Sequence, residues 1–216
     1  MKHFLITRPY HDRPTSYLHS FSRAIVTIAR AELNLRVSEL EGIKAQRKNL
    51  EVALSTKDPT FVFLNGHGDE ESVWGNKDKV LLDRKNIHLT ANMIVYALAC
   101  KSLVSLGKES ILSGTRAYVG YRDEYMCVGE VSKSSVPDKD KNAAPFRKVN
   151  HILIYALLTG TKVSIAIERA KKEYVKLIKT YGSSEDDPFG DAPAIRFALS
   201  WDLLGLDVAG DKSATF

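Results

Sequence analysis

The sequence is poor in cysteine: its 216 residues include only two, Cys100 and Cys127. Domains that depend on disulfide bridges usually carry four or more cysteines, so we expect a fold without bridges in a reducing compartment. Long apolar runs are also missing, because no stretch approaches the ~18 residues of a membrane-spanning helix. A basic start followed by an apolar segment, which would mark a signal peptide, is missing as well. We therefore expect a cytoplasmic protein with no membrane partner.

Several catalytic motifs are missing too. No Gly-x-Ser-x-Gly turn is present, which disfavours an α/β-hydrolase esterase. Residues 66–71 lack the third glycine of a dinucleotide-binding fingerprint, and no Gly-Lys-Ser/Thr loop is present to hold phosphates. The net charge is only +5, and the basic residues are spread along the expected helix faces instead of gathering beside aromatic residues. We therefore expect no cofactor and no direct nucleic-acid partner.

Short apolar runs alternate with segments of helical periodicity. With 44% hydrophobic residues, the 216 residues suit one domain with a single core. The expected strands are 3–7, 33–40, the apolar runs at 61–68 and 93–100, and 115–121, with a small hairpin at 72–82. The expected helices are one capped by Thr15 or Ser16 and those at 43–54, 103–112, 146–158, 162–180 and 193–204. Strands alternating with helices predict an α/β fold with a mainly parallel sheet covered on both faces.

Two segments lack apolar periodicity. Residues 130–145 are rich in lysine, serine and aspartate and are expected to form a long exposed loop. Residues 182–190 are expected to form a second loop before the last helix.

The two apolar runs at 61–68 and 93–100 carry the strongest functional signal. Each is typical of a buried parallel strand, and each leads into a reactive side chain, His67 or Cys100. Ligands of open α/β sheets bind beyond the carboxyl ends of the strands, so two neighbouring strands would bring these side chains to one crevice. An imidazole that takes the proton of a thiol creates a strong nucleophile. The glycines beside His67 allow backbone amides to approach a developing oxyanion.

Other interpretations of these residues remain open. A cysteine at a strand end is often a small buried hydrophobe, and a histidine between glycines is often a turn residue. A metal site built from His67, Asp69, Glu70 and Cys100 lacks the paired spacing of zinc ligands, so we expect no metal. Cys127 is expected to be structural and to alkylate far more slowly than Cys100. The remaining histidines show no partner spacing and are expected to be surface or core residues: His3, His11, His19, His88 and His151.

The order strand, Gly66-His67-Gly68, short hairpin, strand and Ala99-Cys100 resembles the caspase-like cysteine peptidases, which include caspases, gingipains and clostripain. Within that group the chain is most similar to prokaryotic proteins of the CHAT type. The likeness covers residues 1–125 well and the later helices only loosely. It implies a three-layer caspase-like sandwich formed by one peptidase domain, residues 1–216. Residues 1–128 would correspond to the large subunit, 130–145 to the linker and 146–216 to the small subunit.

The resemblance also implies a mechanism. Cys100 would be the nucleophile of a cysteine endopeptidase, His67 would protonate the leaving amine, and the amides of Gly68 and Cys100 would form the oxyanion hole. The family demands no third residue. The expected partners are a protein or peptide substrate and a regulatory protein, and the oligomeric state stays open. The alternative is a caspase-like module that binds partners in a signalling or defence complex without catalysis.

Departures from the caspase pattern affect specificity. The spacing from His67 to Cys100 is shorter than the roughly 50 residues of caspases, and Leu98 replaces the glutamine before Ala-Cys. By analogy, the substrate pocket would lie between Arg8 and the acidic pair Asp123 and Glu124. Because carboxylates select basic side chains, we expect a modest preference for lysine or arginine before the cleaved bond. Apolar or acidic preferences stay open, as does self-cleavage within residues 131–142.

Overall fold

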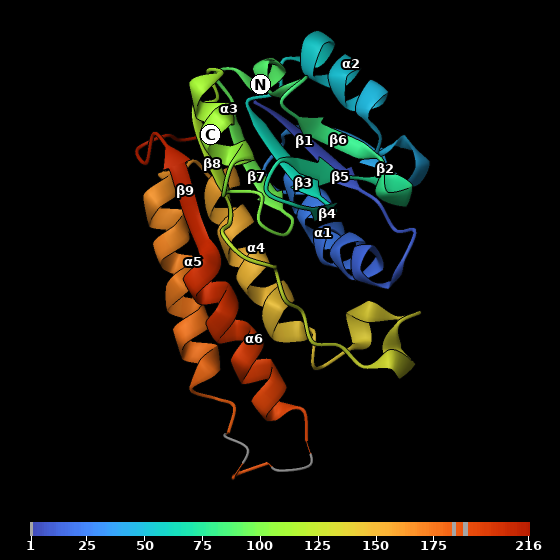
Figure 1. The fold of residues 1–216 in the computed structure, drawn as a ribbon, viewed down its shortest axis with the longest axis vertical. Coiled ribbons are helices and arrows are strands. Elements are labelled where there is room, and N and C mark those ends of the chain that lie inside the picture. Colours follow the sequence, from blue (N-terminus) through green and yellow to red (C-terminus); the bar gives the residue numbers. More distant parts are fainter. Residues whose placement is uncertain (1, 183–184, 188–189) are drawn as a thin grey trace.

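The computed structural model describes residues 2–182, 185–187 and 190–216, and its main feature is a six-stranded sheet (Figure 1). Five strands are parallel, and the last runs antiparallel to its neighbour. In spatial order the strands are β2 (Arg36–Glu41), β1 (His3–Arg8), β3 (Phe61–Asn65), β7 (Ile94–Leu98), β8 (Ala117–Tyr121) and β9 (Leu206–Gly210). The expected mainly parallel α/β sheet is confirmed.

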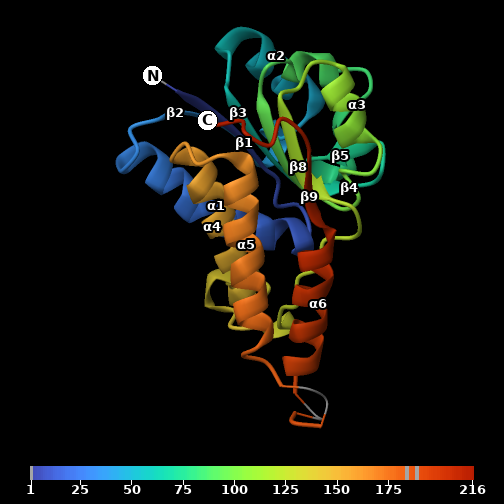
Figure 2. The same ribbon diagram turned by 90° about the vertical axis from the view of Figure 1, so that its left-hand side faces the viewer.

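Alternation along the strands divides the core into two halves. Phe4, Phe63 and Tyr96 point to one face of the sheet, whereas Leu5 and Val62 point to the other. The first face is covered by α1 (Arg13–Ala31), α4 (Ala144–Leu158), α5 (Val163–Ile178) and α6 (Ala192–Gly205). The second face is covered by α2 (Arg47–Lys57) and α3 (Leu106–Leu112). The result is a three-layer sandwich, seen edge-on in Figure 2.

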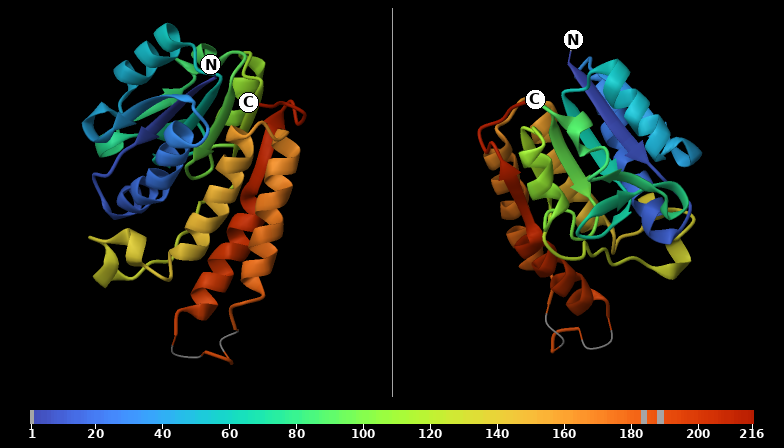
Figure 3. Two further views of the ribbon diagram at one scale, coloured as in Figure 1. Left: turned by 180° about the vertical axis from the view of Figure 1, so that it is seen from behind. Right: turned by 45° about the horizontal axis from the view of Figure 1, so that its top comes forward.

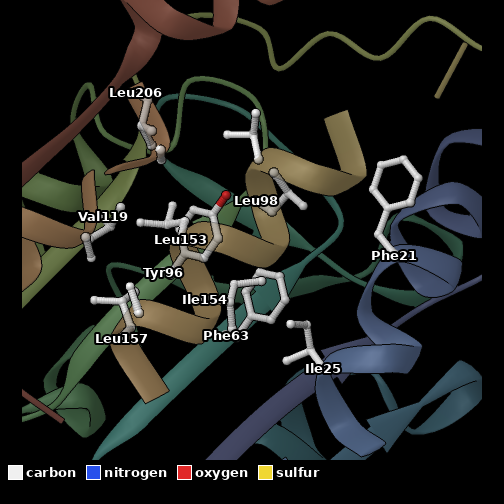
Figure 4. Packing of buried hydrophobic residues seen from close by; sticks show 14 of the residues in the cluster. Phe21, Ile25, Phe63, Tyr96, Leu98, Val119, Leu153, Ile154, Leu157 and Leu206 are labelled. Carbon is white, nitrogen blue, oxygen red and sulfur yellow. The ribbon is translucent and has the colours of Figure 1, made fainter. Parts of the chain in front are cut away.

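The larger half of the core joins both ends of the chain. Figure 4 shows Ile25 of α1 beside Phe63 and Leu153 of α4 beside Tyr96, with Phe21 of α1 further out in the same cluster. The same cluster includes the C-terminal Phe216, whose ring lies 5.8 Å from that of Phe61. Figure 3 shows α4, α5 and α6 lying together and extending past the sheet. None of the helices in the described part of the chain has the length and apolar character needed to cross a membrane.

A second, three-stranded antiparallel sheet lies at the carboxyl end of β3. It is formed by β4 (His67–Gly68), β5 (Ser72–Trp74) and β6 (Val80–Asp83), joined through a 3₁₀ turn at Asn76–Asp78. The hairpin expected at 72–82 is confirmed. His67 therefore belongs to this small sheet, two residues after β3 ends, and not to the β3 strand itself.

Several expected boundaries are wrong, and β9 was not expected at all. Residues 33–35 precede β2 instead of belonging to it, and α3 begins three residues later than its apolar pattern suggested. The helix expected from residue 43 begins at Arg47, after a 3₁₀ turn at Gly42–Lys44. β9 mixes polar residues with apolar ones, only its first residue, Leu206, is buried, and it follows α6 without a break.

The expected exposed loop at 130–145 is more ordered than its composition suggests. It contains 3₁₀ turns at Val131–Lys133 and Pro137–Lys139, and α4 begins already at Ala144. Asp140 is buried, with 1% of its surface exposed, and accepts hydrogen bonds from the Tyr17 hydroxyl and from the Glu130 amide. The buried carboxylate of Asp140 thus fastens the segment to α1, together with Asp138, which pairs with Arg23 of that helix at 3.2 Å. Of the other expected loop, residues 183–184 and 188–189 lie outside the described residues.

Asp140→Asn should loosen this segment. The amide side chain offers one acceptor atom where the carboxylate receives bonds through both oxygens, so we expect a loss of about 1–3 kcal/mol in the free energy of unfolding. Limited trypsin digestion should then cut faster at Lys133, Lys139 or Lys141. Ser135→Ala, at an exposed position in the same segment, is the control. Equal melting temperatures and equal cleavage rates for the two variants would show that Asp140 does not anchor the segment.

Candidate functional site

The pairing of β3 with β7 brings His67 and Cys100 to one place. The two strands are parallel and their last matched pair is Asn65 with Leu98. His67 and Cys100 each follow two residues after that pair, so they leave the sheet at the same level. Both line one cavity of about 490 Å³ at the carboxyl ends of the strands. The crevice expected from the sequence is therefore present, with both side chains in its wall.

Close packing requires glycine before His67 and leaves little room for a side chain after it. A Cβ atom at Gly66 would lie 1.8 Å from the carbonyl oxygen of Trp74, which no side chain tolerates. A Cβ atom at Gly68 would lie 3.0 Å from the Cβ atom of Ala99 and 3.1 Å from the carbonyl oxygen of Cys100. The backbone of Gly68 therefore lies directly against the segment that carries the thiol.

Cys100 begins a tight turn after β7 and is partly buried. The next residue, Lys101, has left-handed backbone (φ 51°), and its amide donates to the carbonyl oxygen of Asp123 at 3.0 Å. Burial raises the pKa of the Cys100 thiol, and the charges of Glu124 and Asp202 act in the same direction. The amides of Tyr125 and of Cys100 itself oppose the shift without cancelling it. At neutral pH the side chain rests as a thiol, and a base is needed to turn it into a nucleophile.

The structure adds a third residue, Asp12, which the sequence analysis did not single out. Its Oδ2 atom lies 2.6 Å from Nε2 of His67. Its Oδ1 atom accepts a hydrogen bond from the Thr15 amide at 2.9 Å, and this bond caps α1. One carboxylate oxygen thus holds the imidazole while the other holds the helix.

Asp12 is held in its ionised form. Partial burial alone would raise its pKa, but hydrogen bonds from the Thr15 hydroxyl and amide and from His67 outweigh burial and lower the pKa. The N-terminus of α1 also favours a negative charge at this position. An ionised Asp12 accepts the proton of Nε2, so the neutral imidazole keeps its lone pair on Nδ1. That nitrogen is the one left to accept a proton from a thiol.

The sequence did contain a signal for Asp12. We expected Thr15 or Ser16 to cap the first helix, but Asp12 is the N-cap, with a proline in the first helical turn. Aspartate followed shortly by proline is a common way to begin a helix. The contact with His67 joins positions far apart in the chain, and no local pattern predicts it.

Residues from four segments complete the cavity wall. Its far side is fastened to α6, because the indole of Trp201 donates to the carbonyl oxygen of Glu124 at 3.0 Å and buried Asp202 accepts from the Met126 amide at 2.9 Å. Besides His67 and Cys100, the wall is formed by Arg13, Pro14, Tyr17, Leu18, Gly66, Leu98, Ala99, Tyr125, Cys127, Val128 and Gly129.

Cys127 differs from its expected structural role. It is exposed and shares the cavity wall with Cys100. Burial raises the pKa of the Cys127 thiol as well as that of Cys100, so the expected contrast in their alkylation rates stays a prediction. Each thiol has to be measured in a variant that lacks the other.

Arg8 does not reach the cavity. Its side chain is 5% exposed and its guanidinium lies against Glu39 at 2.7 Å and the Ser22 hydroxyl at 3.0 Å. It also donates to the carbonyl oxygen of His19. These partners lie on β2 and α1, so Arg8 fastens that helix to the sheet edge. A pocket role for Arg8 is wrong.

The acidic pair is also placed elsewhere. Asp123 and Glu124 are exposed and absent from the cavity wall formed by the described residues. Glu124 pairs with Lys101 at 2.9 Å, which lowers the pKa of its carboxyl. Both residues follow the end of β8 and are exposed to solvent, so the expected basis for selecting lysine or arginine is missing.

The metal ligands considered from the sequence do not form one cluster. Asp69 uses its Oδ1 atom to accept from the amides of Glu71 and Ser72 at 2.8 and 2.7 Å, which closes the turn between β4 and β5. A different set, which shares only His67 with the first, gathers around Asp12: His11, Asp12, His67 and Asp78.

Comparison with known proteins supports the fold. No protein-family model and no curated protein sequence matches this chain. Among solved structures, a chain of the complex of the pro- and mature domains of RgpB from Porphyromonas gingivalis superposes with a TM-score of 0.58 at 11% sequence identity. The match covers 98% of this chain and 47% of that chain, so this protein spans less than half its length. The chain therefore has a caspase-like α/β fold, and this likeness concerns the fold alone.

The raised pKa of Cys100 has a measurable consequence. In a Cys127→Ser background, the rate of iodoacetamide alkylation should be low at neutral pH and should keep rising above ~8.5, where an ordinary cysteine is half ionised. The reason is that only the thiolate reacts with iodoacetamide, and a raised pKa leaves a smaller fraction of Cys100 as thiolate at neutral pH. Cys100→Ser, which leaves Cys127 as the remaining thiol, is the matched control. A rate that levels off well below pH ~8.5 for Cys100 would contradict the raised pKa.

Proposed function

We propose that this protein is a cysteine endopeptidase in which Cys100, His67 and Asp12 act together. The observation that carries the proposal is the placement of His67 and Cys100 in one cavity, with His67 fixed by Asp12 at 2.6 Å. Nucleophile, base and orienting carboxylate are the three parts that activate a thiol or hydroxyl in unrelated hydrolases. The caspase-like fold agrees with this reaction class.

Acylation would begin with a thiol. Nδ1 of His67 takes the proton of Cys100, and the sulfur forms a bond to the substrate carbonyl carbon. The electron pair of the carbonyl moves to its oxygen, where the amides of Gly68 and Cys100 are proposed to stabilise the charge. When the carbonyl forms again, the carbon–nitrogen bond breaks, and the imidazolium gives its proton to the leaving amine. A thioester on Cys100 remains.

Deacylation would use the same groups. His67 takes a proton from water as the oxygen attacks the thioester carbon, and the carbon–sulfur bond then breaks. The sulfur recovers the proton from the imidazolium, and the carboxylic acid leaves. Asp12 keeps the imidazole in one orientation and stabilises its positive charge in both steps, so it is a positioning residue.

The cavity wall indicates which substrates would fit. Its described residues are mostly apolar or aromatic, and Arg13 is the one fully cationic side chain in it. We therefore propose that an apolar residue precedes the cleaved bond, in place of the basic residue expected from the sequence. Arg13 would repel a lysine or arginine.

The wider setting is proposed on the sequence resemblance. On this basis we propose a prokaryotic CHAT-type protein that lies in the cytoplasm and forms one peptidase domain over residues 1–216. Its proposed partners are a protein or peptide substrate and a regulatory protein. A binding module without catalysis is the second candidate. The raised pKa of Cys100 favours it, because a resting thiol also suits a site that performs no chemistry.

A peptide-library assay separates these functions. We expect cleavage by the wild type, a loss of several orders of magnitude in kcat/KM in Cys100→Ala and His67→Ala, and little change in Cys127→Ser. Peptides with leucine or an aromatic residue before the cut should react faster than matched arginine peptides. EDTA should not inhibit. If Cys100→Ala, purified free of other proteases, cleaves as fast as the wild type, the peptidase assignment fails.

Asp12→Asn should lower kcat by roughly 10²-fold or more with little effect on folding. Asparagine is a good N-cap, so α1 keeps its start, but an amide can neither hold the proton on Nε2 nor stabilise an imidazolium. Asp78→Asn, measured with EDTA present, is the control because this neighbouring carboxylate does not contact His67. Equal kcat in Asp12→Asn and the wild type, with equal melting temperatures, would remove Asp12 from the mechanism.

A further inference from the structure

Four side chains with metal-binding atoms meet around His67, which is the one member of the group that also lines the cavity. His11, Asp12, His67 and Asp78 each direct one nitrogen or oxygen into a region where these atoms all lie within 4.8 Å of one another. They come from the turn before α1, from β4 and from the 3₁₀ turn between β5 and β6. Because the residues come from three separate segments, the tertiary fold brings them together, and no single loop does.

The distances suit a small cation. Nε2 of His11 lies 3.3 Å from Oδ1 of Asp78 and 3.8 Å from Oδ2 of Asp12. Ligands of tetrahedral zinc lie about 2.0–2.2 Å from the metal, which places them roughly 3.3 Å from each other. For all four atoms to coordinate one ion, the contact of 2.6 Å between Asp12 and His67 has to lengthen, and any pair near the 4.8 Å limit of the cluster has to move closer.

His11 is held in position for this role. Its side chain is 12% exposed, and its ring lies edge-on to that of His67 with 6.1 Å between centroids. The contacts of its Nε2 atom are with the two carboxylates, whereas its buried Nδ1 atom has no hydrogen-bond partner among the described residues. Coordination through Nε2 would therefore break no other bond of the ring.

Asp78 closes the cluster from outside. Its side chain is 61% exposed, so an ion has a path from solvent. Lys77 and Asp78 both have left-handed backbone, with φ of 53° and 54°, and this conformation ends the 3₁₀ turn beside His11. From the sequence, His11 is expected to be a surface or core residue, because its contact with Asp78 joins positions far apart in the chain.

We propose that His11, Asp12, His67 and Asp78 form a zinc site that switches the protein off. Two imidazoles and two carboxylates suit Zn²⁺, whereas Ca²⁺ and Mg²⁺ prefer oxygen ligands alone. When the metal binds Nε2 of the neutral His67 ring, the one ring proton moves from Nε2 to Nδ1, and no proton is released from the ring. His67 then carries its proton on Nδ1, so it has no lone pair for the thiol of Cys100. Inhibition rests on the proposed peptidase function, but binding does not.

Binding is tested first, with Co²⁺ as a spectroscopic substitute for Zn²⁺. Titration of the whole chain should give the intense visible absorption of tetrahedral Co²⁺, and added Zn²⁺ should remove it. The Cys100→Ala/Cys127→Ser variant should bind equally well, whereas His11→Ala and Asp78→Asn should bind at least about tenfold more weakly. The site would be overturned if the wild type did not bind Co²⁺, or if His11→Ala and Asp78→Asn bound it as tightly as the wild type does. Loss of binding in Cys100→Ala/Cys127→Ser would do the same, because it would assign the metal to thiols.

Inhibition is tested second, by peptide cleavage in buffered Zn²⁺. Zinc should inhibit the wild type, and EDTA should restore its activity. Asp78→Asn should keep its basal activity and need at least about tenfold more zinc for half inhibition. Equal inhibition of Asp78→Asn and the wild type would contradict the switch. If the wild type cleaves no peptide, the peptidase proposal fails while the cobalt titration still decides the metal site.

Discussion

The register between β3 and β7 is the constraint on which the site depends. Because Asn65 pairs with Leu98, the residues two positions further along each strand, His67 and Cys100, leave the sheet together. A slip by one residue would move the apolar side chains of a strand to the opposite face of the sheet, and both halves of the core would be disrupted. The same burial that stabilises the sandwich therefore fixes the geometry of the site.

The start of α1 also helps to fix the position of His67. Asp12 uses one carboxylate oxygen to cap the helix and the other to hold His67. The Asn65 side chain donates to the carbonyl oxygen of Thr7 at 2.7 Å and so ties the end of β3 to β1, just before the turn that carries Asp12. Helix start, strand end and imidazole are thus coupled, and a change in one is transmitted to the others through short polar contacts.

How much of this could be read from the sequence depends on the range of each interaction. The apolar runs before His67 and Cys100 predicted buried parallel strands, and the sheet and both candidate residues followed from them. The sequence pattern did not predict β9, because it is a partly exposed edge strand with polar residues. Asp12, the buried anchor Asp140 and the exposure of Asp123 and Glu124 depend on tertiary contacts. Arg8 looked available for a substrate because its partner Glu39 belongs to another strand.

The central claim is that His67 makes Cys100 a nucleophile toward a carbonyl carbon, and trapping the covalent intermediate tests it most directly. The Cys127→Ser protein would be mixed with an activated peptidyl ester, quenched in acid within a single turnover and weighed intact by mass spectrometry. The account predicts a mass increase equal to the acyl group, located on Cys100 and lost in the His67→Ala/Cys127→Ser variant. An acyl group on another residue, or acylation of Cys100 at the same rate without His67, would contradict it.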